Sequence, residues 1–586
     1  MKVSDYIVNF LSERGVHAVF GYSGGAITHL MDSLSRRSDI HFIQTYHEQS
    51  AAIAVEGYSI FSGTVGVALA TSGPGATNMI TGIADAYFDS IPALYITGQV
   101  NTYEYKGSKP IRQQGFQETD IVSIVKPITK YAVQVFNPLK IRYELEKAWA
   151  IATNGRYGPV LLDIPMDVQR AEVDENSLTG FDDKLSAFNS IKYIGNFSRG
   201  TLASLIKNCK RPLLLLGNGI KLSGAQEKAI ELSRLYKLPV VTSLLGKGAF
   251  PEDDRLSIGM IGSYGNRCAN IAIANADLVI AIGSRLDTRQ TGTNLASFVR
   301  GGNIVRLDID EAEIVNHRLG NVYAAVGDAK LFIDELITMP WNASDNEWLF
   351  YLDRLKSQYG QNAEIARNVE NKKPYLVMDI LNRYASDNQI YCVDIGQNQM
   401  FAAQKILIRN NQSWKTSGGL APMGFAVPSA IGAAFATNKS RPIFAIVGDG
   451  GLHISCQSLL LIAQYKLPIK IILINNKSLG MITQFQDLYF DSRKEGTTKD
   501  SGYIIPDFYF LGKSYGLQYF RIADNDYENE ERLKNIFNAK EAAIIEFDVG
   551  ENTVVYPKLE VNMPVEDLNP KLPVEELQQL MLIDKR

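Results

Sequence analysis

The chain has 586 residues, of which 46% are hydrophobic and 21% are charged, and its formal net charge is −4. This composition predicts a globular protein of three or four domains, and it argues against the basic surface that nucleic acid or an anionic membrane requires. The four cysteines form no CxxC pair, which argues against zinc and dithiol redox sites and favours a reducing, cytoplasmic location. The N-terminus is too polar for a signal peptide, and no run approaches the ~18 apolar residues of a membrane helix.

Unbroken runs of Val, Ile, Leu and Ala alternate with amphipathic stretches along almost the whole chain. Such runs are typical of strands that are covered on both faces, so the sequence predicts parallel sheets in α/β layers. The expected strands are 65–70, 92–97, 159–164, 212–217, 278–283, 303–309, 389–396, 442–447, 469–475 and 542–547.

Two polar stretches, near 171–200 and 338–372, interrupt this alternation and are predicted to be linkers. They divide the chain into three α/β domains, each expected to be a doubly wound parallel sheet, at 1–172, 190–338 and 370–548. The proline-rich segment 549–586 is expected to be an arm packed on the surface.

Glu48 stands between a strand-like segment, 42–46, and a helical stretch, 49–59. An acidic residue at the start of a helix interacts favourably with the helix dipole. Taken alone, Glu48 is therefore best interpreted as a helix-capping residue.

Asp449 ends a buried strand and lies between glycines in the stretch Gly-Asp-Gly-Gly, 448–451. The next strand, 469–475, ends at a pair of asparagines. Because ligands bind beyond the carboxyl ends of parallel strands, Asp449 and Asn476 are expected to lie close together there. Their oxygens suit Mg²⁺, and bare glycine amides at a helix start suit a diphosphate. A lone Gly-Asp-Gly is a common turn, so the asparagine pair carries the weight of this interpretation.

Gly-Asp-Gly followed about 27 residues later by Asn-Asn resembles the signature of thiamine diphosphate enzymes. The resemblance implies that Asp449, Asn476 and the carbonyl of Ser478 hold Mg²⁺ against the cofactor diphosphate. It further implies that Glu48 is catalytic and binds the cofactor's pyrimidine. The other implied cofactor contacts are Pro74, Asn78, Gly396, Gln397, Asn398, Met423, Gly448, Gly450, Gly451 and Met481.

Within these enzymes the chain most resembles the catalytic subunits of acetohydroxyacid synthases (acetolactate synthases), over nearly its whole length. The resemblance makes the three domains pyrimidine-binding, FAD-binding-like and diphosphate-binding, in that order. Each glycine-rich turn of the middle domain alone would also fit a plain strand–helix connection. The implied contacts of an FAD without a redox role are Arg156, Gly217, Gly219, Thr242, Leu244, Gly262, Gly283, Arg285, Asp287, Asp308 and Asp328.

The same resemblance implies which residues face the substrates. Phe116 and Gln117 would line the space over the bound two-carbon fragment. Arg289 would hold the carboxylate of the acceptor, which a planar guanidinium pairs bidentately. Phe485 stands where these synthases usually carry a tryptophan that shapes acceptor choice, so the acceptor stays open between pyruvate, 2-oxobutyrate and a keto-sugar.

Histidine placement is an independent argument. No histidine occurs between His47 and His317, and the loop at 112–114 reads Arg-Gln-Gln. A site poor in general acids preserves a carbon nucleophile long enough for it to attack a second carbonyl. The sequence therefore predicts a transferase that decarboxylates pyruvate and adds the two-carbon unit to an acceptor carbonyl, most simply that of a second 2-oxo acid.

Other interpretations stay open. The enzyme could add the two-carbon unit to a keto-sugar in branched-sugar or surface-polysaccharide biosynthesis, or it could be a flavoenzyme of the pyruvate oxidase type. A dehydrogenase-like or nucleotide-binding regulatory protein is weaker because no full GxGxxG follows a strand. In the family that the chain resembles, the pyrimidine domain of one subunit faces the diphosphate domain of another. The implied assembly is thus a homodimer or a dimer of dimers.

Overall fold

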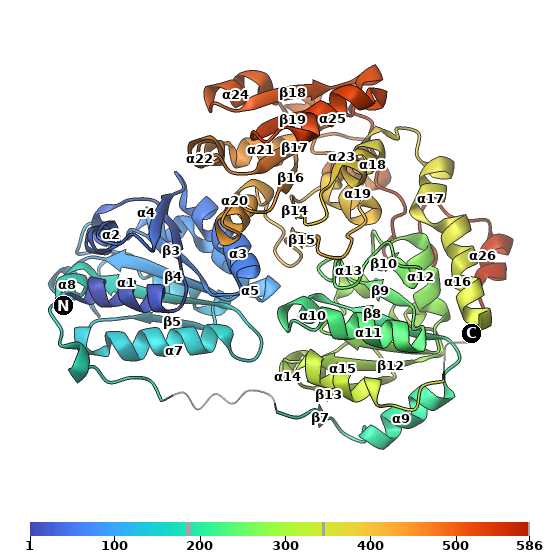
Figure 1. The fold of residues 1–586 in the computed structure, drawn as a ribbon, viewed down its shortest axis with the longest axis horizontal. Coiled ribbons are helices and arrows are strands. Elements are labelled where there is room, and N and C mark those ends of the chain that lie inside the picture. Colours follow the sequence, from blue (N-terminus) through green and yellow to red (C-terminus); the bar gives the residue numbers. More distant parts are fainter. Residues whose placement is uncertain (183–188, 343–345, 584–586) are drawn as a thin grey trace.

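The computed structural model describes residues 1–182, 189–342 and 346–583. The chain forms three α/β units, each built on one sheet with helices packed against it (Figure 1). We call them the first unit (blue in Figure 1), the central unit (green) and the third unit (orange to red). Within the described ranges, no helix is long and apolar enough to span a membrane.

The first unit has a six-stranded sheet in the order β2-β1-β3-β4-β6-β5, with every pair parallel. Its central strands are buried throughout, which is why they stand out as apolar runs. The strands are β1 (Ala18–Gly21), β2 (His41–Gln44), β3 (Gly66–Ala70), β4 (Ala93–Gln99), β5 (Tyr131–Gln134) and β6 (Pro159–Pro165); the helices are α1 (Val3–Glu13), α2 (Thr28–Ser35), α3 (Glu48–Ser62), α4 (Pro74–Asn78), α5 (Ile80–Asp89), α6 (Ile121–Val125), α7 (Ile141–Thr153) and α8 (Met166–Arg170).

The central unit has a seven-stranded sheet in the order β10-β9-β8-β11-β12-β13-β7. Among the described strands, the two-residue edge strand β7 alone pairs antiparallel, with β13. The strands are β7 (Lys192–Tyr193), β8 (Pro212–Leu216), β9 (Val240–Thr242), β10 (Ser257–Met260), β11 (Leu278–Ile282), β12 (Asn303–Asp308) and β13 (Val322–Val326); the helices are α9 (Arg199–Asn208), α10 (Asn218–Leu222), α11 (Gln226–Tyr236), α12 (Arg267–Asn275), α13 (Thr288–Thr291), α14 (Glu311–Val315) and α15 (Ala329–Ile337).

The third unit has a six-stranded parallel sheet in the order β15-β14-β16-β17-β19-β18. Strands β16 and β17 pair in register as far as Gly448 and Ile474, so the ends of both strands lie together, as the sequence predicts. The strands are β14 (Ile390–Val393), β15 (Ser413–Thr416), β16 (Ile443–Gly448), β17 (Ile469–Asn475), β18 (Gln518–Ile522) and β19 (Ala543–Asp548); the helices are α18 (Lys373–Tyr384), α19 (Gln397–Lys405), α20 (Ala426–Ala436), α21 (Asp449–Ile454), α22 (Leu459–Tyr465), α23 (Gly480–Tyr489), α24 (Phe508–Ser514) and α25 (Glu530–Asn538).

The first and third units share one hydrophobic core, which is centred on the packing of α3 against α20 (Figure 1). A Cβ atom on Gly57 would lie 2.0 Å from the Ser429 carbonyl, and one on Gly432 would lie 1.9 Å from the Ala54 carbonyl. Only glycine permits this approach of the two backbones. The packing fixes α3, which begins at Glu48, against α20 of the third unit.

The stretch 338–372, predicted to be a linker, is largely helical in its described part. It contains α16 (Asn346–Tyr359) and α17 (Gln361–Asn368). Trp348, Tyr351 and Leu355 recur at helical spacing and are buried against the central unit, so the segment gains a packed apolar face. Residues 343–345 of this stretch, and 183–188 of the other predicted linker, lie outside the described residues.

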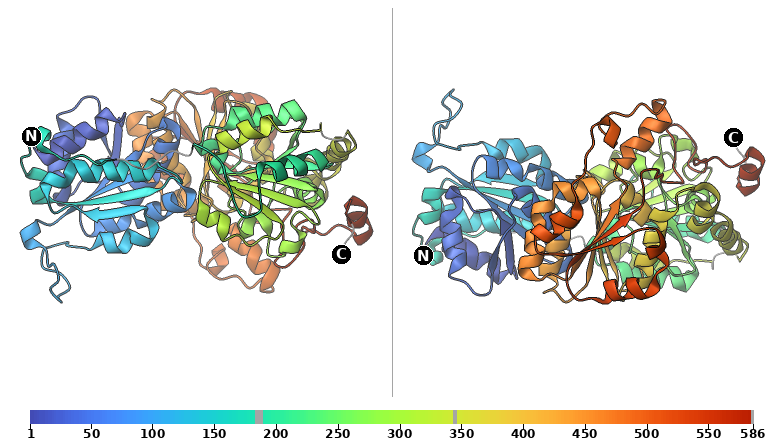
Figure 2. Two further views of the ribbon diagram at one scale, coloured as in Figure 1. Left: turned by 90° about the horizontal axis from the view of Figure 1, so that it is seen from below. Right: turned by 90° about the horizontal axis from the view of Figure 1, so that it is seen from above.

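The C-terminal arm, 549–583, does more than cover the surface. It runs back from the third unit to the central unit, where α26 (Val574–Leu580) lies beside α16 (Figures 1 and 2). The fully buried guanidinium of Arg267 donates to the carbonyls of Leu568 and Pro570 at 3.0 and 2.7 Å. These bonds tie the arm into the interior of the protein.

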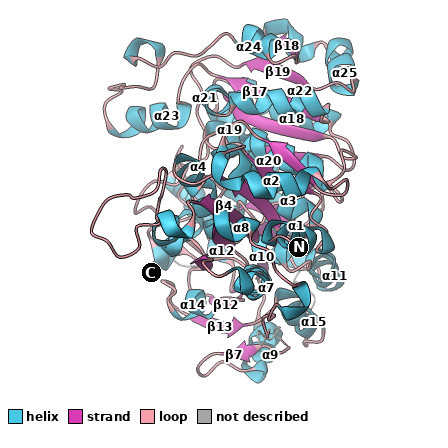
Figure 3. Cartoon of the chain, turned by 90° about the vertical axis from the view of Figure 1, so that its left-hand side faces the viewer, coloured by secondary structure: helices cyan, strands magenta, loops and turns pink. Residues whose placement is uncertain are grey.

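Two segments extend away from the compact part of the chain. The segment after β4, light blue in Figure 2, projects from the first unit, and residues 107–114 along it are exposed. Helix α23 stands out from the third unit (Figure 3). Both carry residues that the sequence analysis assigns to the substrates, namely Phe116 and Phe485.

Candidate active site

Glu48 is the first residue of α3 and is only 6% exposed. The Asn78 amide donates to its Oε2 at 2.9 Å, and Gly75 lies so close that an added Cβ would be 3.3 Å from its Oε1. Within the described ranges, Oε1 has no hydrogen-bond donor. Glu48 is therefore a buried carboxylate with one oxygen oriented by Asn78 and the other available.

The residues predicted to surround Glu48 lie around the start of α4. Pro74 is the first residue of this helix, where its fixed φ suits the helix start. Gln117 has a φ of +64° and packs on Gly73, where an added Cβ would be 3.0 Å from the Gln117 Cβ. The structure thus brings Glu48, Pro74, Asn78 and Gln117 together. It does not bring Phe116 into this group, because that side chain is 85% exposed.

Asp449 begins α21 at the end of β16 and is buried. Its Oδ1 accepts from the Tyr503 hydroxyl at 2.8 Å and from the Gly450 amide at 2.7 Å, whereas its Oδ2 is buried without a partner within the described part of the chain. Burial raises the pKa of Asp449 to about 6, although the Tyr503 hydroxyl and the Gly450 N–H lower it. A buried carboxylate oxygen that lacks a donor is what a metal ion would satisfy.

Asn476 follows β17 and is held by its amide nitrogen. Its Nδ2 donates to Thr553 Oγ1 at 3.1 Å and to Gln397 Oε1 at 3.3 Å, and the Thr553 hydroxyl donates to the same Gln397 oxygen at 2.6 Å. The network fixes the orientation of the amide, and its Oδ1 has no donor among the described residues. Asn476 therefore offers a free oxygen on the strand end next to Asp449.

The two glycine-rich turns predicted for the diphosphate lie beside these residues. A Cβ atom on Gly396 or on Gly448 would lie 3.2 Å from the same atom, Asn398 Oδ1, so the turns face each other across Asn398. A Cβ on Gly450 would lie 2.9 Å from both the Met423 Cε methyl carbon and the Tyr503 hydroxyl oxygen. Gly451 lies against Asp394, and the Ser478 hydroxyl donates to the Thr497 carbonyl at 3.0 Å.

Sequence reasoning missed Thr553 and Tyr503 as members of this site. Neither belongs to a motif, and both reach the site from loops. We expect Thr553→Val to weaken the joint binding of Mg²⁺ and thiamine diphosphate by about 10–100-fold, because the Asn476 amide loses a partner that orients it. Titration calorimetry of the cofactor pair measures this, and Thr553→Ser, which keeps the hydroxyl, is the matched control. Equal affinity in the valine variant would exclude the orienting role.

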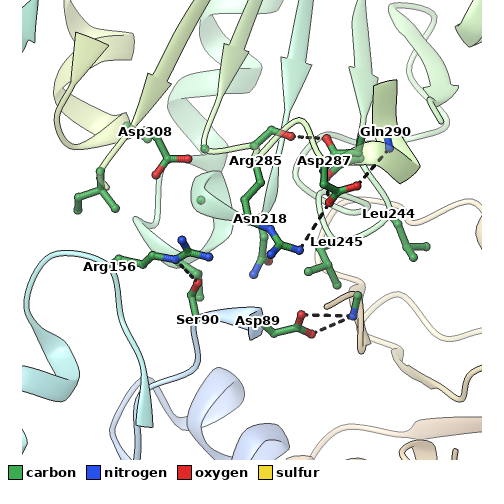
Figure 4. A pocket seen from close by; sticks show the side chains of 18 of the residues that line it. Asp89, Ser90, Arg156, Asn218, Leu244, Leu245, Arg285, Asp287, Gln290 and Asp308 are labelled. Carbon is green, nitrogen blue, oxygen red and sulfur yellow. Dashed lines mark hydrogen bonds and ion pairs between the residues drawn. The ribbon is translucent and has the colours of Figure 1, made fainter. Parts of the chain in front are cut away.

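A cavity of about 380 Å³ lies where the three units meet (Figure 4). Ser90 and Arg156 of the first unit face Arg285 and Asp308 of the central unit across it. Arg156 donates to the Ser90 hydroxyl at 2.9 Å and pairs with the carboxylates of Asp310 and Glu313. Its walls combine polar and apolar side chains with glycine turns at the ends of strands, which suits a dinucleotide.

Most residues predicted for FAD line this cavity. Gly217, Thr242 and Gly262 do not, but each is adjacent in the chain to one that does. The sequence analysis missed four further lining residues: Asp89, Ser90, Asn218 and Gln290. Asp89 and Ser90 were missed because no glycine motif marks them. The predicted residues that line the cavity are Arg156, Gly219, Leu244, Gly283, Arg285, Asp287, Asp308 and Asp328, together with Arg289.

A third group joins the central unit to α23. The Arg289 carbonyl accepts from the Ser263 amide at 2.7 Å, and the neighbouring Tyr264 hydroxyl donates to Met481 Sδ at 3.2 Å. Phe485, one helical turn beyond Met481, packs against Tyr489 with 4.5 Å between ring centroids and the ring planes tilted by 51°. The predicted acceptor residues Arg289 and Phe485 are thus linked through Tyr264 and Met481.

The Glu48 group and the Asp449 group remain separate within one chain. Over the residues that the structure describes, no hydrogen bond or ion pair joins Glu48, Asn78 or Gln117 to Asp449 or Asn476. The first group belongs to the first unit and the second belongs to the third unit. We refer to these two groups as half-sites.

Three family models match the chain: "Thiamine pyrophosphate enzyme, N-terminal TPP binding domain" at 1–124, its central domain at 200–336 and its C-terminal TPP binding domain at 394–547. Curated relatives match over most of the chain. A probable acetolactate synthase large subunit of Methanocaldococcus jannaschii is 37% identical over 93% of this chain and 91% of its own length. The acetolactate synthase large subunit of Corynebacterium glutamicum is 37% identical (96% and 89%), and that of Lactococcus lactis is 34% identical (96% and 95%).

Proposed function

This chain belongs to the thiamine pyrophosphate (thiamine diphosphate) enzyme family, and on that basis we propose that it decarboxylates pyruvate and adds the remaining two-carbon unit to an acceptor carbonyl. It is an acetolactate synthase-like transferase, and the simplest acceptor is a second 2-oxo acid. The observation that carries this function is a pair of oxygens, Asp449 Oδ2 and Asn476 Oδ1, that have no hydrogen-bond donor among the described residues. They lie at adjacent strand ends beside two glycine-rich turns.

The residues at both half-sites fit the cofactor. We propose that Asp449, Asn476 and the Ser478 carbonyl hold Mg²⁺, because the unpartnered Asp449 oxygen is satisfied by a cation. When it is bound, thiamine diphosphate supplies an electron sink for the bond that breaks as carbon dioxide leaves. Glu48, oriented by Asn78, would hold a proton at its free Oε1 for exchange with the cofactor's pyrimidine.

We further propose that FAD occupies the cavity between the three units and has no redox role. Arg156, held by two carboxylates and Ser90, and the glycine turns of the central unit support this assignment. The four cysteines are free thiols, which fits the reducing cytoplasm that we propose as the location.

Product identification tests the function. The purified enzyme with Mg²⁺, thiamine diphosphate and FAD is given pyruvate alone, then pyruvate with 2-oxobutyrate or a keto-sugar, and the products are identified by mass spectrometry. We expect 2-acetolactate from pyruvate alone. Oxygen uptake, or flavin bleaching under anaerobic pyruvate at the rate of carbon dioxide release, would indicate a pyruvate oxidase instead.

We propose that the active unit is a homodimer or a dimer of dimers, in which the Glu48 half-site of one subunit faces the Asp449 half-site of another. Subunits carrying Glu48→Gln are unfolded and refolded, or co-expressed, with subunits carrying Asp449→Ala. We expect the mixture to reach about one quarter of wild-type activity. About half of the dimers formed are mixed, and each mixed dimer has one intact site out of two. If each site lay within one chain, the mixture would stay inactive.

Acceptor choice depends on Phe485, whose ring is 46% exposed on α23. We expect Phe485→Trp to shift the product ratio toward the 2-oxobutyrate product by about tenfold, because a larger ring changes the apolar space beside the acceptor side chain. The ratio is measured with both 2-oxo acids present. Phe490→Trp, at a neighbouring exposed ring, is the matched control, and an unchanged ratio in the Phe485 variant would show that Phe485 does not set the preference.

A further inference from the structure

Lys558 in the C-terminal arm is a largely buried residue whose ammonium has no anion beside it within the described part of the chain. The residue is only 6% exposed, and its ammonium lies over the faces of Phe485 and Tyr489, 5.3 and 4.9 Å from the ring centroids. Throughout the described chain, no carboxylate lies within 4.0 Å of this ammonium and no acceptor takes any of its three N–H donors.

Such an arrangement is unusual for lysine, which is seldom buried unless it is paired. The aromatic faces attract the charge but leave the N–H donors without oxygen acceptors. Burial lowers the pKa of Lys558, and the charge of Glu560 raises it from a greater distance. The Glu560 carboxylate has its own donor, the Asn569 amide at 3.3 Å. The N–H groups of the Lys558 ammonium therefore have no acceptor among the described residues and can bind an anion from solution.

The position of Lys558 connects it to the acceptor residues. Its neighbour Leu559 donates through its amide to the Ser263 carbonyl at 2.7 Å, and Ser263 donates to the Arg289 carbonyl at 2.7 Å. Phe485 belongs to α23, and the ammonium of Lys558 from the arm lies over its ring. Two short backbone bonds and one ring contact therefore join Lys558, Arg289 and Phe485.

We propose that Lys558 is an anion-binding residue of the acceptor site, so that the preferred acceptor carries a second anionic group in addition to the carboxylate that Arg289 takes. This inference rests on the proposed function and names its substrate class: a 2-oxo acid whose side chain carries a carboxylate or a phosphate. The reaction balances without a redox partner. One carbon–carbon bond breaks as carbon dioxide leaves pyruvate, one forms to the acceptor's ketone carbon, and the ketone oxygen gains a proton.

A competition assay with the holoenzyme tests the proposal. Pyruvate is supplied with 2-oxobutyrate and one dianionic probe, meaning a 2-oxo acid with a second anionic group, either 2-oxoglutarate or 3-phosphohydroxypyruvate, and the two cross-products are quantified by mass spectrometry. We expect the wild-type enzyme to favour one of the dianionic probes, and the identity of the probe distinguishes a carboxylate from a phosphate. In Lys558→Met the ratio of dianionic to 2-oxobutyrate product is expected to fall by about 30-fold or more.

Two further variants separate charge from shape. Lys558→Arg keeps the cation and is expected to retain the preference, whereas Lys571→Met removes an exposed lysine of the same arm and should leave the ratio as in the wild type. Titration calorimetry of the favoured probe against the holoenzyme without pyruvate gives a second readout, since its Kd should rise in Lys558→Met even if turnover is lost.

The outcomes distinguish this inference from the function on which it rests. If the wild-type enzyme favours 2-oxobutyrate over both dianionic probes, or if Lys558→Met leaves the product ratio and the Kd unchanged, Lys558 binds no acceptor anion. If pyruvate alone yields no 2-acetolactate, the proposed function itself is overturned.

Discussion

Replacement of Glu48 by glutamine is expected to reduce turnover by about 10²–10³-fold, because an amide cannot hold the proton that the carboxylate exchanges with the cofactor ring. The glutamine side chain keeps the shape of Glu48 and can still accept from Asn78. Cofactor binding and the free energy of unfolding should therefore change little. Steady-state product formation measures the loss, and titration calorimetry with thiamine diphosphate measures the retained binding.

Glu144→Gln is a control for the removal of a carboxylate from the same unit. Glu144 lies on α7, where it accepts from the Tyr131 hydroxyl at 2.5 Å, away from the Glu48 group. Turnover of this variant should match the wild type. Near wild-type turnover in Glu48→Gln would refute the catalytic role that we assign to Glu48.

Replacement of Asp449 by asparagine is expected to change stability and binding in opposite directions. In the cofactor-free protein it should raise the free energy of unfolding by about 1–3 kcal/mol, because it removes a buried oxygen whose charge has no partner. In the presence of Mg²⁺ and thiamine diphosphate, the affinity should fall by more than about 100-fold, since the metal loses a charged ligand. Thermal unfolding with and without the cofactor pair measures both effects.

The matched control is Asp163→Asn. Asp163 is also buried, but its oxygens accept from Thr97 at 2.6 Å and from Gln99 at 3.0 Å, so the substitution disrupts satisfied bonds. This variant should lose stability and keep the increase in Tm on cofactor addition. If Asp449→Asn behaved in the same way, losing stability and keeping the increase, the assignment of Asp449 as a metal ligand would be wrong.

The strands predicted from the sequence are those that lie in the interior of the three sheets. Their runs of apolar residues are long because both faces are covered, as in β8 and β17, which are buried at every position. Edge strands carry no such signal. Strand β18 is exposed at Gln518 and Arg521 and buried only at Ile522, and β7 has two residues, so their pairing is decided by the neighbouring strand and by tertiary packing.

The same contrast holds for the site. Motifs at strand ends place Asp449 and Asn476 correctly on neighbouring strands, because the register of a parallel sheet follows from its hydrophobic pattern. Thr553 and Lys558 could not be identified from the sequence, because each contacts residues that are distant in the chain and no motif links them. Thr553, for example, follows Asn476 by 77 residues. The helices of the supposed linker were missed for a different reason, since polar residues around them outweighed the apolar face.

Loss of the C-terminal arm is expected to inactivate the protein without removing any strand of its described sheets. A stop codon directly after residue 548 would spare every strand of the three sheets in the described chain, since the last of them, β19, ends there. It would nevertheless delete the hydroxyl that orients Asn476 and the ammonium beside Phe485. We expect such a truncation to be a loss-of-function allele, although it leaves the strands of all three described sheets intact.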